Sequence, residues 1–327
     1  MESNPRLVST PWRQGLRVLA SLLLAVLATP PMAAEAPPEV RAREVAEGVW
    51  FVQGEAALGT AANRNFISNA GFIVTSEGVV VIDALGSPAL ANALIAEIGR
   101  VTRQPIRALI VTHFHADHIY GLQAFKALGA TILAHPAGKE YLQSDTAQRR
   151  LEASRQEMSP WVNEGTRLVA ADHWLDGEEN TLRMGGLDLV IRHVGPAHTA
   201  EDLVVFLPQR AVLFAGDLVF RGRIPFVGQA DSRQWIASLS RLIEFKPALL
   251  VPGHGPVSDS PMADLSMTRD YLVHLRKTMA QAAANLEPFE EAYAKADWSR
   301  FEHLPLFRAA NRMNAYNTYL LLEQQGR

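Results

Sequence analysis

A cluster of three histidines and one aspartate within six positions constrains this chain more than any other feature. The sequence THFHADH occupies residues 112–118, after an apolar run that predicts a buried strand and before apolar residues at helical spacing. His113 and His115 are two positions apart, so in an extended segment they point the same way. Asp117 and His118 follow where the helix begins, aimed at a second position. Imidazole and carboxylate are good zinc ligands, so this segment predicts a loop that serves two adjacent metal ions.

Three further segments place a ligand-type residue beside glycine or proline at the end of a predicted strand. They are GPAHT with His198, AGD with Asp217 and PGHGP with His254. A lone histidine is more often structural. Three such segments downstream of THFHADH nevertheless predict that their side chains converge on one site. The alternative, that residues 112–118 are only a polar loop rich in histidine, does not explain the three downstream segments.

The chain has no cysteine, so any metal ligands are nitrogen and oxygen atoms. Disulfides, thiolate metal sites and a thiol nucleophile are excluded. Hydrophobic residues make up 48% and charged residues 20% of the 327 positions, as in a folded globular protein. The formal net charge is -3, with no basic block. We therefore expect no nucleic-acid partner. The weak net charge does not identify a substrate, which we expect to be a small molecule.

The N-terminus has the layout of a secretory signal peptide. Arginines at positions 6, 13 and 17 precede the apolar run 18–28, and small residues follow at 33–36. The apolar run has 11 residues, short of the ~20 that a spanning helix needs. We predict cleavage between residues 33 and 36, a periplasmic or secreted protein, and no stable membrane insertion afterwards. An uncleaved N-terminal anchor is the alternative.

Strand and helix patterns alternate through two similar halves, which predicts a layered α/β fold with the site between the halves. The first half has predicted strands at 49–52, 66–68, 71–74, 79–82, 108–112 and 131–134, and predicted helices at 88–101, 119–128 and 138–158. The second half has a strand pair within 182–194, a hairpin of 203–207 with 211–215, a helix at 232–244 and a strand at 249–251. From residue 261 on, only helices are predicted.

The ordered motifs resemble the metallo-β-lactamase superfamily over roughly residues 47–256. The resemblance implies a four-layer αββα sandwich. We predict a signal peptide over 1–36, the metallo-β-lactamase-like domain over 37–260, and a C-terminal helical extension over 261–327 that packs on the domain. The implied first-zinc ligands are His113, His115 and His198. The implied second-zinc ligands are Asp117, His118 and His254, with Asp217 bridging both ions and Asp83 bracing the ligand loop.

The implied chemistry is hydrolysis by a metal-bound hydroxide. Two Zn²⁺ ions, or iron or manganese in their place, lower the pKa of a shared water towards neutrality. Asp117 orients the hydroxide and accepts its proton. We expect an ester, thioester, lactone or related carbonyl substrate. The alternatives are a β-lactamase, a mononuclear iron persulfide dioxygenase-like enzyme, and a non-catalytic periplasmic binding protein.

The complete ligand set is more similar to the hydroxyacylglutathione hydrolase and lactonase branches than to lactamases that use cysteine or histidine alone. The run 219–226, with the signal peptide, resembles periplasmic members associated with sulfur oxidation or quinoprotein systems. Arg221 and Arg223 in this run are candidate clamps for a substrate carboxylate, and loop surface charge is the alternative. Tyr120 is a candidate oxyanion donor, and the loop 54–63 is a candidate flap. The sequence carries no signal for an oligomeric state.

Overall fold

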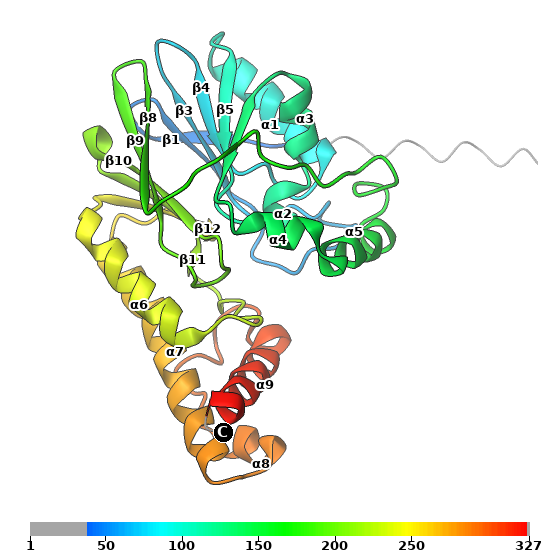
Figure 1. Ribbon diagram of the computed structural model, residues 1–327, viewed down its shortest axis with the longest axis vertical. Helices are drawn as coiled ribbons and strands as arrows, with labels where there is room; N and C mark the ends of the chain where they lie inside the picture. Colours follow the sequence, from blue (N-terminus) through cyan, green and yellow to red (C-terminus); the bar gives the residue numbers. More distant parts are fainter. Residues whose placement is uncertain (1–37, 326–327) are drawn as a thin grey trace, which may run out of the picture. The chain divides into compact units, whose positions relative to one another are not determined.

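The computed structural model describes residues 38–325, so the predicted signal peptide at 1–36 lies outside the described residues. Two β-sheets face each other, and helices cover their outer faces (Figure 1). The predicted αββα sandwich with a C-terminal helical region is therefore confirmed. Among the described helices, none is long and apolar enough to cross a membrane.

The first sheet has seven strands in the order β1-β2-β3-β4-β5-β6-β7. Strands β1 to β4 pair antiparallel, and β4 to β7 pair parallel. All residues of the apolar strand β4 are buried, as expected of a strand covered on both faces. The bounds are β1 Ala42–Ala46, β2 Val49–Val52, β3 Ala70–Val74, β4 Val79–Ile82, β5 Ile106–Ile110, β6 Thr131–Ala134 and β7 His173–Trp174.

The second sheet has five strands in the order β12-β11-β10-β9-β8. Only β11 and β12 pair parallel, and the other neighbours pair antiparallel. Apolar side chains from both sheets, such as Val80 and Phe214, form a shared core between them. The bounds are β8 Glu179–Met184, β9 Leu187–His193, β10 Leu203–Leu207, β11 Val212–Phe220 and β12 Leu249–His254.

Helices on the first sheet bury an apolar stripe against it. In α1, Leu90, Leu94 and Ile98 recur at helical spacing and are buried, and the Ser87 side chain caps the helix by accepting a hydrogen bond from Leu90 N. The bounds on this side are α1 Pro88–Val101, α2 Ala116–Ile119, α3 Leu122–Ala127, α4 Gly138–Gln143 and α5 Asp145–Glu157.

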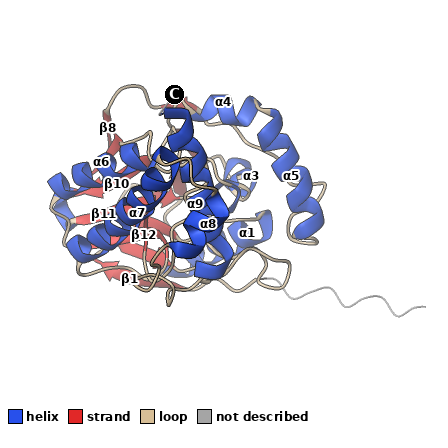
Figure 2. Cartoon of the chain, turned by 90° about the horizontal axis from the view of Figure 1, so that it is seen from below, coloured by secondary structure: helices blue, strands red, loops and turns tan. Residues whose placement is uncertain are grey.

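The C-terminal helices pack on the second sheet through α6 and α7. Trp235 of α6 and Leu272 of α7 share a core with Leu213 and Leu250 of the sheet. Helix α9 packs on α7, and Figure 2 shows α7, α8 and α9 grouped together. The bounds are α6 Ser232–Leu242, α7 Pro261–Ala284, α8 Phe289–Lys295 and α9 Phe307–Gln325, with 3₁₀ turns at Pro208–Arg210 and Ile243–Phe245. The exact domain limits stay predictions.

Several local predictions were wrong. Residues 66–68 form a loop rather than a strand, and strands β1 and β7 were missed. Strand β1 lies at a sheet edge and contains the charged residues Arg43 and Glu44, so no alternation of apolar residues marks it in the sequence. Residues 138–158 form two helices because Ser144 ends α4 and caps α5 through Ala147 N. The segment 119–128 is likewise divided between α2 and α3.

Candidate metal centre

Imidazole nitrogens of His113, His115 and His198 lie close together. His115 Nδ1 lies 3.2 Å from His113 Nε2 and 2.9 Å from His198 Nε2. Asp217 Oδ2 completes this group at 3.4 Å from His198 Nε2 and 3.8 Å from His113 Nε2. The ligand-type atoms of these four side chains all lie within 4.8 Å of one another.

A second group lies beside the first. Asp117 Oδ2 is 3.6 Å from His118 Nε2 and 3.3 Å from His254 Nε2. Asp217 contacts this group too, because its Oδ1 lies 3.2 Å from His118 Nε2 and its Oδ2 lies 3.2 Å from His254 Nε2. The structure thus brings all seven predicted ligand side chains together, with Asp217 between the two groups.

The ligands come from loops, from the short helix α2 and from strands in both halves. Strand β5 leads into the loop that carries His113, and α2 begins directly after His115. His198 lies in the loop after β9, where Asp202 accepts hydrogen bonds from Thr199 N and Oγ1, both at 2.8 Å. His254 is the last residue of β12.

The predicted strand end at Asp217 was wrong. Strand β11 continues through Asp217 to Phe220, and its pairing with β12 shifts register on either side of Gly216. Gly216 has a φ of 52°, which glycine adopts without the steric cost that a Cβ would bring. This irregularity is a bulge-like distortion, and it lies next to the residue whose carboxylate faces both groups.

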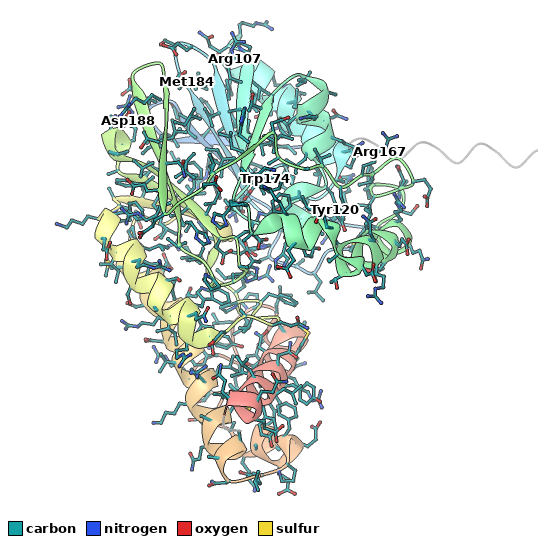
Figure 3. All side chains as sticks on the ribbon, in the orientation of Figure 1. Arg107, Tyr120, Arg167, Trp174, Met184 and Asp188 are labelled. Carbon is teal, nitrogen blue, oxygen red and sulfur yellow. The ribbon has the colours of Figure 1, made fainter. Side chains whose placement is uncertain are left out.

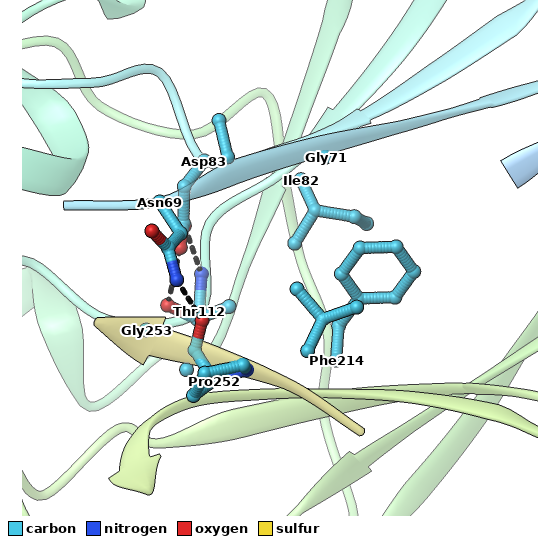
Figure 4. Close-up of a pocket in the computed structure, with 11 residues that line it drawn as sticks. Asn69, Gly71, Ile82, Asp83, Thr112, Phe214, Pro252 and Gly253 are labelled. Carbon is cyan, nitrogen blue, oxygen red and sulfur yellow. Dashed lines mark hydrogen bonds between the residues drawn. The ribbon is translucent and has the colours of Figure 1, made fainter. Parts of the chain in front are cut away.

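Asp83 connects the end of β4 to the ligand loop (Figure 4). Its Oδ1 accepts a hydrogen bond from Thr112 N at 2.8 Å, and its Oδ2 accepts one from Thr112 Oγ1 at 2.8 Å. Asp83 Oδ2 also lies 2.9 Å from His118 Nδ1. A carboxylate in this position orients the imidazole and leaves the opposite nitrogen free for a metal.

The donor atoms fit a pair of divalent cations. The outer nitrogens of His113, His118 and His254 face Thr112 Oγ1, Asp83 Oδ2 and Ile67 O, so their Nε2 lone pairs face the cluster. Among the described residues, buried His118 Nε2 and Asp217 Oδ1 have no hydrogen-bond partner. The nitrogen separations of 2.9 and 3.2 Å are close to the ~3.3 Å that follows from tetrahedral geometry with bonds of ~2.0–2.1 Å.

Burial and the neighbouring charges favour the metal-binding protonation states of His113, His198 and Asp217. Against the effect of burial, the carboxylates of Asp217 and Asp117 instead raise the pKa of His118 and of His254. Burial lowers the pKa of His113 well below its usual range and lowers the pKa of His198 to about 3, so both imidazoles are neutral at neutral pH. Burial alone would raise the pKa of Asp217. The nearby His254 and His118 outweigh that effect and hold the pKa of Asp217 well below its usual range.

Two of the predicted substrate-binding side chains have partners elsewhere. Tyr120 is 1% exposed, and its hydroxyl lies 3.4 Å from Ser154 Oγ of α5, within the helical layer (Figure 3). Arg221 donates to Val257 O at 2.6 Å and pairs with Asp264 of α7 at 2.9 Å. These contacts support packing and docking roles, and the oxyanion-donor role of Tyr120 and the carboxylate-clamp role of Arg221 stay predictions. Arg223 lies beside His254, with Nη1 at 3.3 Å from His254 Nδ1.

The loop before β3 contributes residues that the sequence analysis missed. Ser68 Oγ donates to Asp117 O at 2.5 Å. Asn69 Nδ2 donates to Pro252 O, as Figure 4 shows, and to Gly255 O, both at 2.8 Å. The loop therefore contacts both ligand segments. In the candidate flap 54–63, Gly54 N donates to Asn69 Oδ1 at 3.1 Å, and Ala61 O accepts a hydrogen bond from Trp161 Nε1 at 2.9 Å. An adjacent polar pair between apolar runs was the only sequence signal for Ser68 and Asn69.

A family model described as "Metallo-beta-lactamase superfamily" matches residues 63–254, which is more than half of the chain and includes all seven clustered side chains. The chain belongs to the metallo-beta-lactamase superfamily. It is 27% identical over 242 residues to a linear primary-alkylsulfatase of Pseudomonas sp. (strain ATCC 19151), covering 62% of this chain and 45% of that protein. It is 28% identical over 218 residues to a metallo-beta-lactamase type 2 of Bacillus cereus, covering 65% of this chain and 75% of that protein.

Solved structures of the superfamily share the fold. A metallo-beta-lactamase from Pontibacter korlensis matches with a TM-score of 0.57 at 24% identity, over 72% of this chain and 99% of that one. The inverting sec-alkylsulfatase Pisa1 from Pseudomonas sp. matches with a TM-score of 0.69 at 18% identity, over 86% of this chain and 50% of that one. The chain therefore spans about half of each alkylsulfatase.

These findings confirm the predicted superfamily and the prediction of a metal-dependent hydrolase with a His/Asp metal site. The hydroxyacylglutathione hydrolase-like branch stays a prediction, because these superfamily relatives are β-lactamases and alkylsulfatases.

Proposed function

We propose that the protein is a dinuclear zinc hydrolase that acts on the carbonyl of an ester, thioester, lactone or related substrate. The position of the Asp217 carboxylate carries this proposal. Its oxygens lie 3.2 Å from His118 Nε2 and from His254 Nε2, and 3.4 Å from His198 Nε2. A carboxylate within reach of both nitrogen groups can neutralise part of the repulsion between two cations and set their separation.

His113, His115, His198 and Asp217 would hold one ion, and Asp117, His118, His254 and Asp217 the other. When bound, two such ions supply a water of lowered pKa and polarise the substrate carbonyl. Asp117 Oδ2 lies among the nitrogens of the second group, where it can orient that water and accept its proton. Asp83 keeps His118 in the tautomer that presents Nε2.

Two other substrate classes follow from the relatives. The similarity to the type 2 metallo-beta-lactamase of Bacillus cereus supports a β-lactam substrate, and the similarity to the alkylsulfatases supports a sulfate ester. Imidazole and carboxylate ligands also suit iron and manganese, so a mononuclear iron persulfide dioxygenase-like enzyme is the alternative chemistry. A periplasmic binding protein without activity is the remaining alternative.

One experiment separates these functions. The purified protein is loaded with zinc, its metal content is measured, and it is assayed against aryl esters, thioesters, lactones, β-lactams and alkyl sulfates. We expect two zinc ions per chain and turnover of at least one carbonyl substrate. One iron per chain with persulfide oxidation, or two metals with no turnover of any substrate, would contradict the proposal. Mass spectrometry of the exported protein tests the predicted periplasmic location.

A further inference from the structure

His198 lacks the hydrogen bond that orients three of the other predicted histidine ligands. The outer nitrogens of His113, His118 and His254 each face an oxygen atom. The outer nitrogen of His198, Nδ1, is buried and has no hydrogen-bond partner among the described residues. A metal-binding imidazole usually donates from its outer nitrogen to a partner that fixes the orientation of the ring. Other contacts must therefore hold the ring of His198.

Two aromatic side chains supply these contacts. The ring centroid of Trp235 in α6 lies 5.2 Å from that of His198, with 62° between the ring planes. The ring centroid of Phe220, the last residue of β11, lies 5.8 Å from that of His198, with 66° between the planes. Edge-to-face pairs at such distances are favourable. Phe220 is 2% exposed and Trp235 is fully buried, so both rings are enclosed by protein.

Phe220 also contacts a ligand of the second group. Its ring stacks on that of His254, with centroids 5.0 Å apart and 7° between the planes. Phe220 and His254 are partners in the parallel pairing of β11 with β12, so strand pairing brings these rings together. The ring of Trp235 pairs with His198 and, at 6.3 Å, with Phe220, but with no other ligand histidine of the described chain. Phe220 therefore contacts both ligand groups, whereas Trp235 contacts the first group alone.

Helix α6 is fixed to the segments on both sides of these rings. Trp235 Nε1 donates to Leu218 O at 3.1 Å, next to Asp217 in β11. Ser238 Oγ donates to Val194 O at 2.5 Å, and Arg241 donates to the same carbonyl, at the start of the loop that carries His198. The indole therefore has little freedom to turn. Such a fixed support is what holds a metal ligand in one orientation.

We propose that Phe220 and Trp235 are positioning residues of the metal centre, which orient their ligand histidines by ring packing in place of a hydrogen bond. Trp235 positions His198, and Phe220 positions both His198 and His254. This inference rests on the metal centre of the proposed function and is independent of the substrate. It requires that the two rings act on different ions: loss of the Trp235 ring affects the ion of the first group, and loss of the Phe220 ring affects both ions.

The test measures metal affinity in full-length Trp235→Met and Phe220→Met variants. Methionine keeps an apolar side chain at each position but is flexible and has no flat ring. Phe301→Met is the matched control, because Phe301 is fully buried and its ring pairs with Tyr271 at 5.3 Å, away from every ligand histidine. Competition with a chromogenic chelator gives the affinity for each ion. The two groups differ in their numbers of nitrogen and oxygen ligands, so the absorption spectrum of the cobalt-loaded protein reports which ion is affected.

In Trp235→Met we expect the affinity of the first group to fall about 3- to 10-fold, the size expected for loss of an aromatic pair, and that of the second group to stay unchanged. In Phe220→Met both affinities should fall. Trp235→Phe, which keeps a ring, should retain most of the affinity. Phe301→Met should lower the stability of the metal-free chain and leave both affinities unchanged.

Wild-type affinities and cobalt spectra in Trp235→Met and Phe220→Met would overturn the proposal. An equal loss in Phe301→Met would also overturn it, because the effect would then follow from a weakened core. Failure of Trp235→Met or Phe220→Met to fold in excess zinc would have the same consequence, since that ring would hold the core together rather than a ligand.

The same measurements separate this inference from the proposed function. A wild-type protein that binds two ions and turns over no substrate contradicts the proposed function, while the affinities of the variants still decide the role of the two rings. A wild-type protein that binds one ion contradicts the dinuclear centre, and Trp235→Met then tests whether that ion depends on the ring beside His198.

Discussion

Gly253 of β12 lies against the Asp217 carboxylate so closely that a Cβ at residue 253 would be 1.9 Å from Asp217 Oδ1 and 2.7 Å from Gly216 C. Strand β12 pairs parallel with β11, the strand that carries Asp217, and this pairing shifts register at Gly216. The carboxylate therefore occupies space that any other residue at position 253 would fill. The position of Asp217 between the two ligand groups depends on this glycine.

Gly253→Ala should displace Asp217 and weaken metal binding without altering any ligand. We expect fewer than two metal ions per chain after dialysis, and a fall in activity of at least tenfold, since alignment errors of about 1 Å can cost 10²-fold. Metal analysis and far-ultraviolet circular dichroism check the result. Gly99→Ala in α1 is the control, because nothing lies within 4 Å of a Cβ there. Full metal content in Gly253→Ala would show that the carboxylate has room to move.

Asp217→Ala should lose metal from the second group first, because His113, His115 and His198 still offer three nitrogens to the first ion. Activity should fall by orders of magnitude, since one ion cannot serve both the water and the leaving group. Stoichiometry measured by equilibrium dialysis checks this. Two metals per chain with wild-type turnover in Asp217→Asn would contradict a bridging role.

Asp83→Ala should weaken metal binding although Asp83 is not a predicted ligand. The change removes an acceptor from Thr112 N, Thr112 Oγ1 and His118 Nδ1. We expect metal affinity to fall roughly 10- to 100-fold, which is typical when a residue that orients a metal ligand is removed. Competition with a chromogenic chelator measures it. Asp83→Asn is the companion variant because asparagine tolerates the observed φ of 62°. Unchanged affinity in both variants would exclude a bracing role.

Metal removal should destabilise the fold as well as abolish activity. Ligand segments from both sheets converge on the centre, and a metal that binds only the native state adds about 2.7 kcal/mol when its free concentration is 100 times its dissociation constant. Thermal melts with and without a strong chelator should differ by several degrees. Equal melting temperatures after verified metal removal would count against a converging site.

His135 should make the metal-free protein lose stability in mild acid. Its ring stacks on that of His193 at 3.6 Å, and burial together with His193 lowers the pKa of His135 to about 4. An unfolded imidazole has a pKa of about 6.5, so between these values the unfolded state binds a proton that the folded state does not. Stability is therefore present above pH ~6.5 and is lost as the pH falls towards 4. Urea unfolding at pH 7 and pH 5, with chelator present throughout, should show a smaller loss for His135→Gln than for the wild type. An equal loss would contradict this linkage.

The sequence by itself determined the superfamily, the layered fold and the set of ligand-type residues. These features are local. The THFHADH segment, the apolar run Val79–Ile82 and the helical spacing in Pro88–Val101 can each be recognised within a few consecutive residues. Periodicity and residue chemistry act over that range, so they predicted β4 and α1 with their observed bounds.

Only the tertiary structure decided which side chains around the metal centre contact one another. The sequence predicted the same role for Arg221 and Arg223, yet Arg221 pairs with Asp264 while Arg223 Nη1 lies 3.3 Å from His254 Nδ1. Asn69 reaches Pro252 across 183 positions, and strand β11 continues past Asp217 because β12 pairs beside it. Such partners are distant along the chain, and no local pattern encodes which of them will meet. These contacts are set when the two sheets pack, because packing determines which polar groups are buried together. Buried polar groups must then form hydrogen bonds with one another.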